Sequence, residues 1–324
     1  HFNIPGSGPH TITPGSMLPT ITEAAVIDGT SEPDFTSTPV IELDGSLAGA
    51  GANGLHLFGA GHTGSTIRGL AIGGFAAGSG IRLEGGGGHF IEANHLGIDP
   101  MGTSARANLI GINVLCPDNT IGGNTAEQRN IISDNQRGVL INGAAATGNT
   151  VSGNYVGTDV SGNVDHGNTK DGVKIRHASY NTIGGDTPGE RTVISRNDST
   201  GVVLIEADNN TIQGNYIGTK VDGTNPLGNL VGVVLNKSSD NLIGGSMSAG
   251  QGNLISGNTR DGVRLVGGAL AIDNRIEGNL IGTDKHGQAA LPNQLDGIRN
   301  KAARNVIGST DPDRRNIISG NNGN

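Results

Sequence analysis

The sequence has few of the residues on which many small or membrane-bound proteins depend. Cys116 is its single cysteine, so no internal disulfide can form and no particular redox compartment is needed. The chain contains no tryptophan, and aromatic residues make up 2% of its 324 residues. No apolar run is long enough for a transmembrane helix. We therefore expect no membrane insertion and a fold whose stability does not come from cross-links.

Charged residues are also scarce, at 15%, and the formal net charge is −8. The chain has no run of lysine and arginine, which nucleic acids and anionic membranes would require, so we expect neither as a partner. Glycine is abundant instead, with 57 residues. These glycines follow no Gly-X-Y triplet, which excludes collagen, and each one inside a helix would cost about 1 kcal/mol relative to alanine. Turn-rich β structure remains.

The chain nearly repeats itself about every sixty residues. The block GNYVGTD at 153–159 returns as GNYIGTK at 214–220 and as GNLIGTD at 278–284, and a weaker copy, ANHLGID, stands at 93–99. The offsets are 60, 61 and 64 residues. Self-similarity at a fixed period predicts one elongated body of stacked units rather than two ordinary domains.

Each sixty-residue unit divides into two coils. A glycine followed by a short alternating run marks each coil, at intervals of 26–35 residues from Gly54 to Gly297. The period-two alternation predicts three short strands in each coil. Their inward positions align into three columns of mainly valine and isoleucine, which run from Leu55 to Ile298, from Ile121 to Ile307 and from Leu96 to Ile318. Such columns predict a three-sided tube with an aliphatic interior.

Asparagines open the second and third strands of most coils. One series runs from Asn119 to Asn305, and the other runs from Asn94 to Asn316 with Thr192 as its only break. Asparagine tolerates the left-handed backbone that a sharp corner demands, and its side-chain amide can bond to the copies above and below. We therefore predict asparagine ladders at two corners of the tube.

These motifs, recurring in a fixed order, resemble the right-handed parallel β-helix repeats of bacterial secreted and cell-surface proteins. The resemblance covers about residues 54–324 and implies an all-β solenoid of about nine or ten coils of 26–35 residues. It also implies a secreted or cell-surface location. Residues 1–53 hold six of the twelve prolines, and we assign them to an N-terminal cap with one or two opening coils.

The two ends of the sequence lead to separate predictions. It starts at His1 without methionine and shows no signal-like segment, so we expect a mature or trimmed product. Its last residues match the interior of a repeat and bring no capping element. We therefore expect the repeats to continue beyond Asn324, or another surface to cover this end.

In lyases and hydrolases of this fold, the resemblance places the active site on the outer face of the first strand. That face has its densest polar patch at Lys174, Arg176, His177, Glu206 and Lys237, with Asn142 and Asn236 beside it as candidate ligand-binding residues. The patch suits β-elimination from a uronic-acid polymer, in which Arg176 neutralises the carboxylate and His177 or Lys174 removes the C5 proton. The simpler interpretation is an ion ladder on a solvated sheet.

Three features count against an enzyme. Coil lengths show no large insertion that could wall a cleft, and aromatic platforms for sugar rings are scarce. The charged patch is also flanked by apolar residues, which suits docking to a protein better than to a polar glycan. These residues are Leu140, Val203, Ile205 and Val234.

Acidic loops raise the question of a metal ion. Asp99, Asp159 and Asp284 each begin an Asp-x-x-Gly segment that could offer carboxylates to Ca²⁺. Aspartate and glycine at the ends of a type I turn explain the same spacing, and Lys220 replaces the aspartate in the remaining copy. We therefore expect turns without a cofactor, with Ca²⁺ as the alternative. His166 and His286 lie in these loops as isolated residues, with no partner at ligand spacing.

Two functions from different classes follow. The first is a secreted or surface-displayed structural and interaction module, a rigid rod for adhesion, matrix or filament assembly, with a protein or glycan partner and end-to-end self-association. The second is a polysaccharide lyase acting on an anionic, uronic-acid glycan at the outer face of the first sheet. We rank the first higher, because a repeat end without a cap could receive the next subunit.

Overall fold

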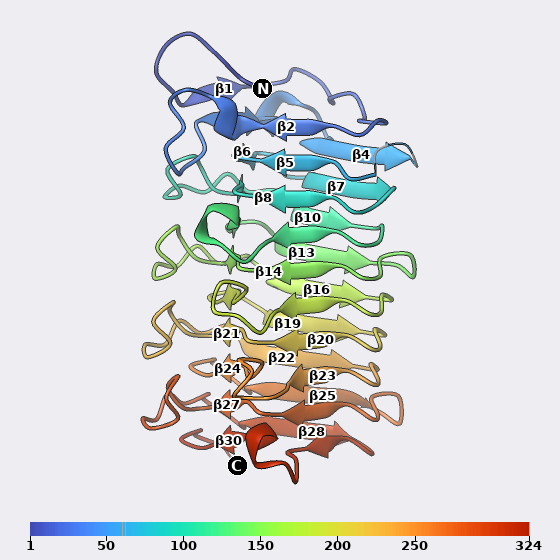
Figure 1. Ribbon diagram of the computed structural model, residues 1–324, viewed down its shortest axis with the longest axis vertical. Helices are drawn as coiled ribbons and strands as arrows, with labels where there is room; N and C mark the ends of the chain where they lie inside the picture. Colours follow the sequence, from blue (N-terminus) through green and yellow to red (C-terminus); the bar gives the residue numbers. More distant parts are fainter. Residues whose placement is uncertain (60, 62, 324) are drawn as a thin grey trace.

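The chain winds into one long tube of stacked coils (Figure 1). The computed structural model describes residues 1–59, 61 and 63–323, so Asn324, the last residue of the predicted repeat region, lies outside the described residues. Over these residues the strands form three sheets of nine, ten and eleven strands. Neighbouring strands within each sheet pair in parallel. The prediction of an all-β parallel β-helix is confirmed.

The three sheets follow the three strands of each coil. Sheet B holds the first strands: β4 (Leu55–Gly59), β7 (Ser79–Gly85), β10 (Ile110–Val114), β13 (Arg137–Asn142), β16 (Val173–Arg176), β19 (Thr200–Ile205), β22 (Val231–Asn236), β25 (Val263–Gly268) and β28 (Ile298–Ala302). Sheet C holds the second strands: β2 (Val26–Asp28), β5 (Thr66–Arg68), β8 (Phe90–Glu92), β11 (Thr120–Gly122), β14 (Thr150–Ser152), β17 (Thr182–Gly184), β20 (Thr211–Gln213), β23 (Leu242–Gly244), β26 (Arg275–Glu277) and β29 (Val306–Ile307). Sheet A holds the third strands: β1 (His10–Ile12), β3 (Ile41–Asp44), β6 (Leu70–Gly73), β9 (His95–Leu96), β12 (Ile131–Ile132), β15 (Tyr155–Val156), β18 (Val193–Ile194), β21 (Tyr216–Ile217), β24 (Leu254–Ile255), β27 (Leu280–Ile281) and β30 (Ile317–Ile318).

The first fifty residues contribute to two of these sheets. Strand β1 pairs with β3, which pairs with β6 of the next coil, and β2 pairs with β5. Short 3-10 helices lie in the connections at both ends of the tube and in one coil between them: η1 (Gly29–Ser31), η2 (Gly45–Leu47), η4 (Ala126–Gln128) and η5 (Pro312–Arg314).

The interior of the tube contains the three predicted aliphatic columns. Ile121, Val151 and Ile183 occupy paired positions on successive strands of sheet C, and all three are fully buried. The columns of sheets A and B show the same register, for example Val173 opposite Val202. In the last coil the columns reach solvent, with Ile307 and Ile318 each 44% exposed. The core is therefore continuous along the tube, because β-branched side chains of each coil pack on those of the next.

Both predicted asparagine ladders are present. Asn181 donates from Nδ2 to Oδ1 of Asn210 at 3.1 Å, and Asn210 donates to Asn241 at 3.2 Å. One detail of the prediction is wrong: the residue with the left-handed backbone is the one before the ladder asparagine, such as Tyr180 or Asp240. The asparagine amide instead satisfies backbone groups of the adjacent coils, which lie buried at the corner.

A third ladder, which the sequence analysis missed, lies at the corner between sheets A and B. Its side chains are buried except for Asn321 in the last coil, and each donates from Nδ2 to Oδ1 of the next, as Asn135 does to Asn168 at 3.2 Å. The other bonds of this type lie at 2.8–3.1 Å. The ladder comprises Asn108, Asn135, Asn168, Asn197, Asn229, Asn258, Asn293 and Asn321.

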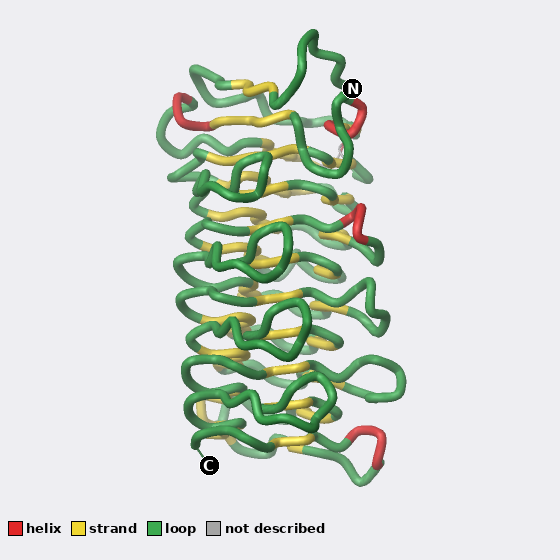
Figure 2. The backbone as a smooth tube through the Cα atoms, turned by 90° about the vertical axis from the view of Figure 1, so that its left-hand side faces the viewer, coloured by secondary structure: helices red, strands yellow, loops and turns green. Residues whose placement is uncertain are grey.

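Two families of loops protrude from the tube, and Figure 2 shows each family stacked along it. The first family follows sheet A in every second coil and forms four small hairpins, closed by the bridges Ile98 to Ala105, Thr158 to Asp165, Thr219 to Pro226 and Thr283 to Ala290. The second family connects sheet C to sheet A and includes η4 and η5. Between the families, the outer side of sheet A carries a second apolar cluster that includes Tyr155, Tyr216 and Leu254.

Candidate functional site

The outer face of sheet B carries the polar patch that the sequence singled out. Its outward column has the predicted register, since Leu140 pairs with Lys174, Lys174 with Val203, and Val203 with Val234. The neighbouring column pairs Asn142 with Arg176, Arg176 with Ile205, and Ile205 with Asn236. Of the two candidate ligand-binding residues, Asn142 therefore lies on the strand next to that of Arg176. Asn236 lies two strands away from Arg176 on the other side.

Lys174 lies in a group of cations around a single carboxylate. Its Nζ is 3.9 Å from Oδ2 of Asp171, and Nε of Arg137, one coil away, is 3.8 Å from the same oxygen. The Lys174 side chain is largely covered, whereas Arg176 is exposed. Burial lowers the pKa of the Lys174 ammonium, and the charges of Arg137, Arg176 and Lys170 lower it further, while Asp171 opposes the change. Two cations thus share one carboxylate, and the charges of two more act on Lys174.

Three members of this group, Arg137, Lys170 and Asp171, were not among the residues predicted from the sequence. Each lies beside the start of a first strand, where the residue type varies from coil to coil, so no column drew attention to it. A signal was nevertheless present, because Asp171 directly precedes the marker glycine and its neighbours in the sequence and in the adjacent coil are cationic. We name Arg137, Lys170, Asp171, Lys174 and Arg176 the cation cluster.

The other three candidate catalytic residues form a separate chain of ion pairs. Glu206 lies between two basic side chains, with its Oε2 3.3 Å from Nδ1 of His177 and its Oε1 3.3 Å from Nζ of Lys237. All three residues have left-handed backbones at the corner that follows sheet B. A depression of about 330 Å³ adjoins Glu206 and Lys237 and continues over the exposed Leu270. The charges at this corner largely compensate one another, as an ion ladder does.

The apolar residues that flank the patch are mostly covered. Val203 is 6% exposed, and Leu140, Ile205 and Val234 are half-buried. Such a strip offers little open apolar surface for another protein. The expectation that this strip favours a protein partner loses its main support.

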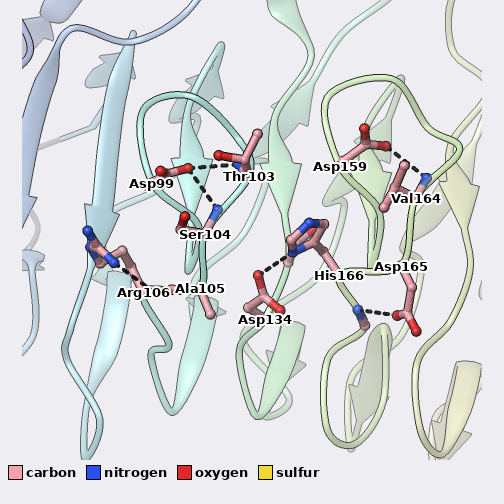
Figure 3. A network of polar contacts seen from close by, with 12 residues as sticks. Asp99, Thr103, Ser104, Ala105, Arg106, Asp134, Asp159, Val164, Asp165 and His166 are labelled. Atoms are coloured by element: carbon pink, nitrogen blue, oxygen red, sulfur yellow. Dashed lines mark hydrogen bonds and ion pairs between the residues drawn. The ribbon is translucent and has the colours of Figure 1, made fainter.

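The Asp-x-x-Gly segments form turns. In two hairpins the aspartate carbonyl accepts from the glycine N–H three residues on, at 2.9 Å for Asp99 and 3.0 Å for Asp159. Oδ1 of Asp99 accepts from the backbone N–H groups of Thr103 and Ser104, and Oδ1 of Asp159 accepts from that of Val164 (Figure 3). Asp284 makes the same bonds in the last hairpin. One oxygen of each of these carboxylates is therefore engaged by its own loop.

Where Lys220 replaces the aspartate, a neighbour takes over its role. The Lys220 carbonyl still accepts from Gly223 N–H, while Oδ1 of Asp222 accepts from the N–H groups of Thr224 and Asn225. Among the described residues no group of three or more histidine, cysteine, aspartate or glutamate side chains could hold a metal ion.

His166, isolated in the sequence, has one carboxylate neighbour in the folded chain. Its Nδ1 lies 2.8 Å from Oδ2 of Asp134, a residue of the adjacent coil, and Figure 3 shows the imidazole pointing to that carboxylate. Burial raises the pKa of the Asp134 carboxyl, and the hydrogen bond from His166 only partly offsets this effect. Asp165 next to it pairs with Arg196, with Nε and Oδ2 2.7 Å apart.

Comparison with known proteins gives the handedness of the tube. No protein-family model matches the chain, and no curated protein matches its sequence. The solved structure of the Dettilon tailspike protein is similar over 97% of this chain and 59% of that chain, with 15% identity and a TM-score of 0.55. The chain is a right-handed parallel β-helix.

A second solved structure supports the same fold. The A-module of the mannuronan C-5 epimerase AlgE6 from Azotobacter vinelandii is similar to this β-helix over 97% of this chain and 83% of that module, with 14% identity and a TM-score of 0.53. The β-helix spans less than two thirds of the tailspike's length. No helix within the described part of the chain is long and apolar enough to cross a membrane.

Proposed function

We propose that this β-helix is a secreted or cell-surface interaction module that binds an anionic glycan on the outer face of sheet B. The observation that carries the proposal is the excess of positive charge in the cation cluster, where Arg137 and Lys174 share the carboxylate of Asp171 while the charges of Lys170 and Arg176 act on Lys174. A self-compensating ion ladder would not leave such an excess, least of all on a chain with a net charge of −8.

The sheet gives these cations a fixed spacing. Lys174 and Arg176 project from the same strand, β16, and Arg137 opens β13 beside it. Neighbouring strands lie about 4.8 Å apart, so carboxylates along an extended polymer could meet the cations without any rearrangement of the backbone. Asn142, in register with Arg176, adds an amide that can bond sugar hydroxyls.

The comparisons support a glycan as the partner. A mannuronan C-5 epimerase, whose name gives a polymer of mannuronate as its substrate, has this fold, and so has a tailspike protein. At 14–15% identity these similarities concern the fold, so the glycan class rests on the charge of the cluster.

Calorimetric titration with polymannuronate and polygalacturonate tests the proposal, with neutral dextran as the comparison ligand. We expect salt-sensitive binding of the two anionic polymers. The double variant Lys174→Met/Arg176→Met should bind them about ten-fold or more weakly, because two charged contacts are lost. Lys301→Met is the matched control, since Lys301 is an exposed lysine of the same sheet on β28. Equal binding of dextran, or an unaffected double variant, would refute the proposal.

A polysaccharide lyase is the second candidate, and the lowered pKa of Lys174 favours it. A lysine that releases its proton more readily can act as a base, and the exposed guanidinium of Arg176 on the same strand could neutralise a uronate carboxylate. The test follows the ultraviolet absorbance of an unsaturated product from the same polymers. Turnover that disappears in Lys174→Ala would establish the lyase, and binding without turnover would leave the interaction module.

We also propose that the interaction module serves in adhesion, in a matrix or in filament assembly. A protein partner and end-to-end association of copies remain our expectations from the sequence, and sedimentation of the purified chain over a range of concentrations tests the latter. A single monomeric species at all concentrations would remove self-association and leave glycan binding untouched.

A further inference from the structure

A pocket lies on the outer side of sheet A, on a different sheet from the cation cluster. It has a volume of about 180 Å³ and sits between the hairpin that carries Lys285 and the loop that carries Met247. Arg191, Tyr216, Gly252 and Leu280 also line it. Among the described residues that line this pocket, two are cationic and none is acidic.

The pocket arises where the repeat changes its side chains. In two earlier coils an arginine stacks on the tyrosine of the next coil, with the guanidinium carbon of Arg129 4.2 Å from the ring centre of Tyr155 and that of Arg191 4.2 Å from that of Tyr216. The next pair in this series is Gly252 and Leu280, so both large side chains are absent there. The space that an arginine and a tyrosine side chain would fill at this position forms the pocket.

The two stacked arginines differ in their hydrogen bonds. Nε of Arg129 donates to the carbonyl of Gly153 at 3.2 Å. Nε of Arg191 is buried and has no hydrogen-bond partner within the described part of the chain. A buried N–H of a charged group without an acceptor is costly, so this atom calls for an acceptor that a ligand could supply.

The hairpin adds a second positive charge at this position only. Each hairpin rests on the one before it, and the residues at the contact are Val160, Val221 and Lys285 in turn. Lys285 thus stands where Val221 stands one repeat earlier. Next to Lys285, Oδ1 of Asp284 accepts hydrogen bonds from the backbone N–H groups of Gln288 and Ala289 in the same hairpin. Among the described residues, the ammonium of Lys285 makes no ion pair within 4.0 Å, and the nearby charge of Asp222 acts on Tyr216.

We propose that this pocket, which Arg191 and Lys285 border, binds the carboxylate of a single acidic sugar or a similarly small carboxylate ligand. Its volume is below the range of about 300–1,000 Å³ that is usual for larger ligands, so it takes one small anionic group rather than a polymer segment. The planar guanidinium of Arg191 matches a carboxylate, and the covered face of Tyr216 holds that guanidinium in place.

Titration with sodium glucuronate, followed by calorimetry and by the NMR signals of the pocket residues, tests this inference. We expect one saturable site, and Arg191→Gln should weaken it about ten-fold or more. Lys285→Val installs the residue of the preceding hairpin on the exposed surface, so it should keep the fold and weaken binding as well. Arg129→Gln is the matched control and should bind like the wild type, because the Nε of Arg129 already has an acceptor.

Three outcomes would overturn the inference: no saturable binding by the wild type, equal losses in Arg129→Gln and Arg191→Gln, or full binding by Lys285→Val. Glucose and sulfate distinguish the ligand chemistry. Equal binding of glucose would remove the role of charge, and sulfate that binds as tightly as glucuronate would overturn the assignment to a carboxylate. The Lys174→Met/Arg176→Met variant should bind glucuronate normally here, so failure of the glycan proposal and failure of this one are distinguishable.

Discussion

At the scale of single residues, the asparagine ladder of sheet A shows what one substitution costs. Thr192 stands in the place of a ladder asparagine between Asn154 and Asn215. Oδ1 of Asn215 is buried and has no hydrogen-bond partner among the described residues, whereas Oδ1 of Asn154 accepts from Asn130. A threonine side chain is too short to supply the missing amide donor, so the break leaves an orphaned acceptor.

Repairing the break should stabilise the protein. We expect Thr192→Asn to raise the free energy of unfolding by about 1 kcal/mol, because the new amide can donate to Asn215 and accept from the backbone of Asn154. Urea denaturation measures the change. Thr310→Asn, at an exposed position, is the control and should have little effect. A less stable Thr192→Asn variant would show that the ladder geometry does not continue through this coil.

Two of the three asparagine ladders could be predicted from the sequence, and the third could not. Two ladders were predictable because their asparagines stand in repeated motifs such as NTIGG, at a fixed distance from an inward aliphatic residue. The third ladder escaped because its flanking residues vary and its distance to the marker glycine is sometimes three and sometimes four residues, as in Asn135 to Gly138 and Asn168 to Gly172. Its recurrence becomes visible once the chain is folded.

At the scale of elements, loops decide contacts that strand register cannot predict. Pairing between strands gave the neighbours of Lys174 correctly, since register follows from the alternation of apolar residues. His166 and Asp134 are 32 residues apart, and they meet because a hairpin folds back over the corner of the preceding coil. Arg137 and Asp171 escaped prediction for another reason, because they lie where strands begin and the residue type varies from coil to coil.

The Asp134–His166 contact predicts a pH dependence of stability. Since the folded protein raises the pKa of Asp134, it binds a proton more readily than the unfolded chain, and the contribution of this group falls as pH rises through its folded pKa. We expect Asp134→Asn to be as stable as the wild type in acid and more stable than it at neutral pH. Thermal unfolding of both proteins across the acidic range provides the measurement. A wild type that gains stability relative to the variant as pH rises would contradict the sign.

At the scale of the whole molecule, each coil is stabilised mainly by the coils beside it. Ile183 and Ile307 belong to the same column of sheet C, but Ile183 is fully buried in the middle of the tube and Ile307 is 44% exposed in its last coil. The same substitution should therefore have different effects at the two positions.

We expect Ile183→Ala to lower the free energy of unfolding by about 3 kcal/mol, as a cavity in a packed core does, and Ile307→Ala to lower it by less than about 1 kcal/mol. Chemical denaturation of the two variants gives both values. Similar losses at the two positions would mean that the last coil is covered in solution by something that the isolated chain recruits, such as a second copy.

The four hairpins lie one above another in alternate coils, which sets a regular pitch of about 10 Å along the molecule. A partner with its own periodic structure can engage several hairpins at once, and every contact after the first then benefits from a high local concentration. Contacts that are individually weak can in this way add up to durable attachment, and the stiffness of the stack keeps the spacing constant. A flexible tether with the same hairpins would lose that advantage.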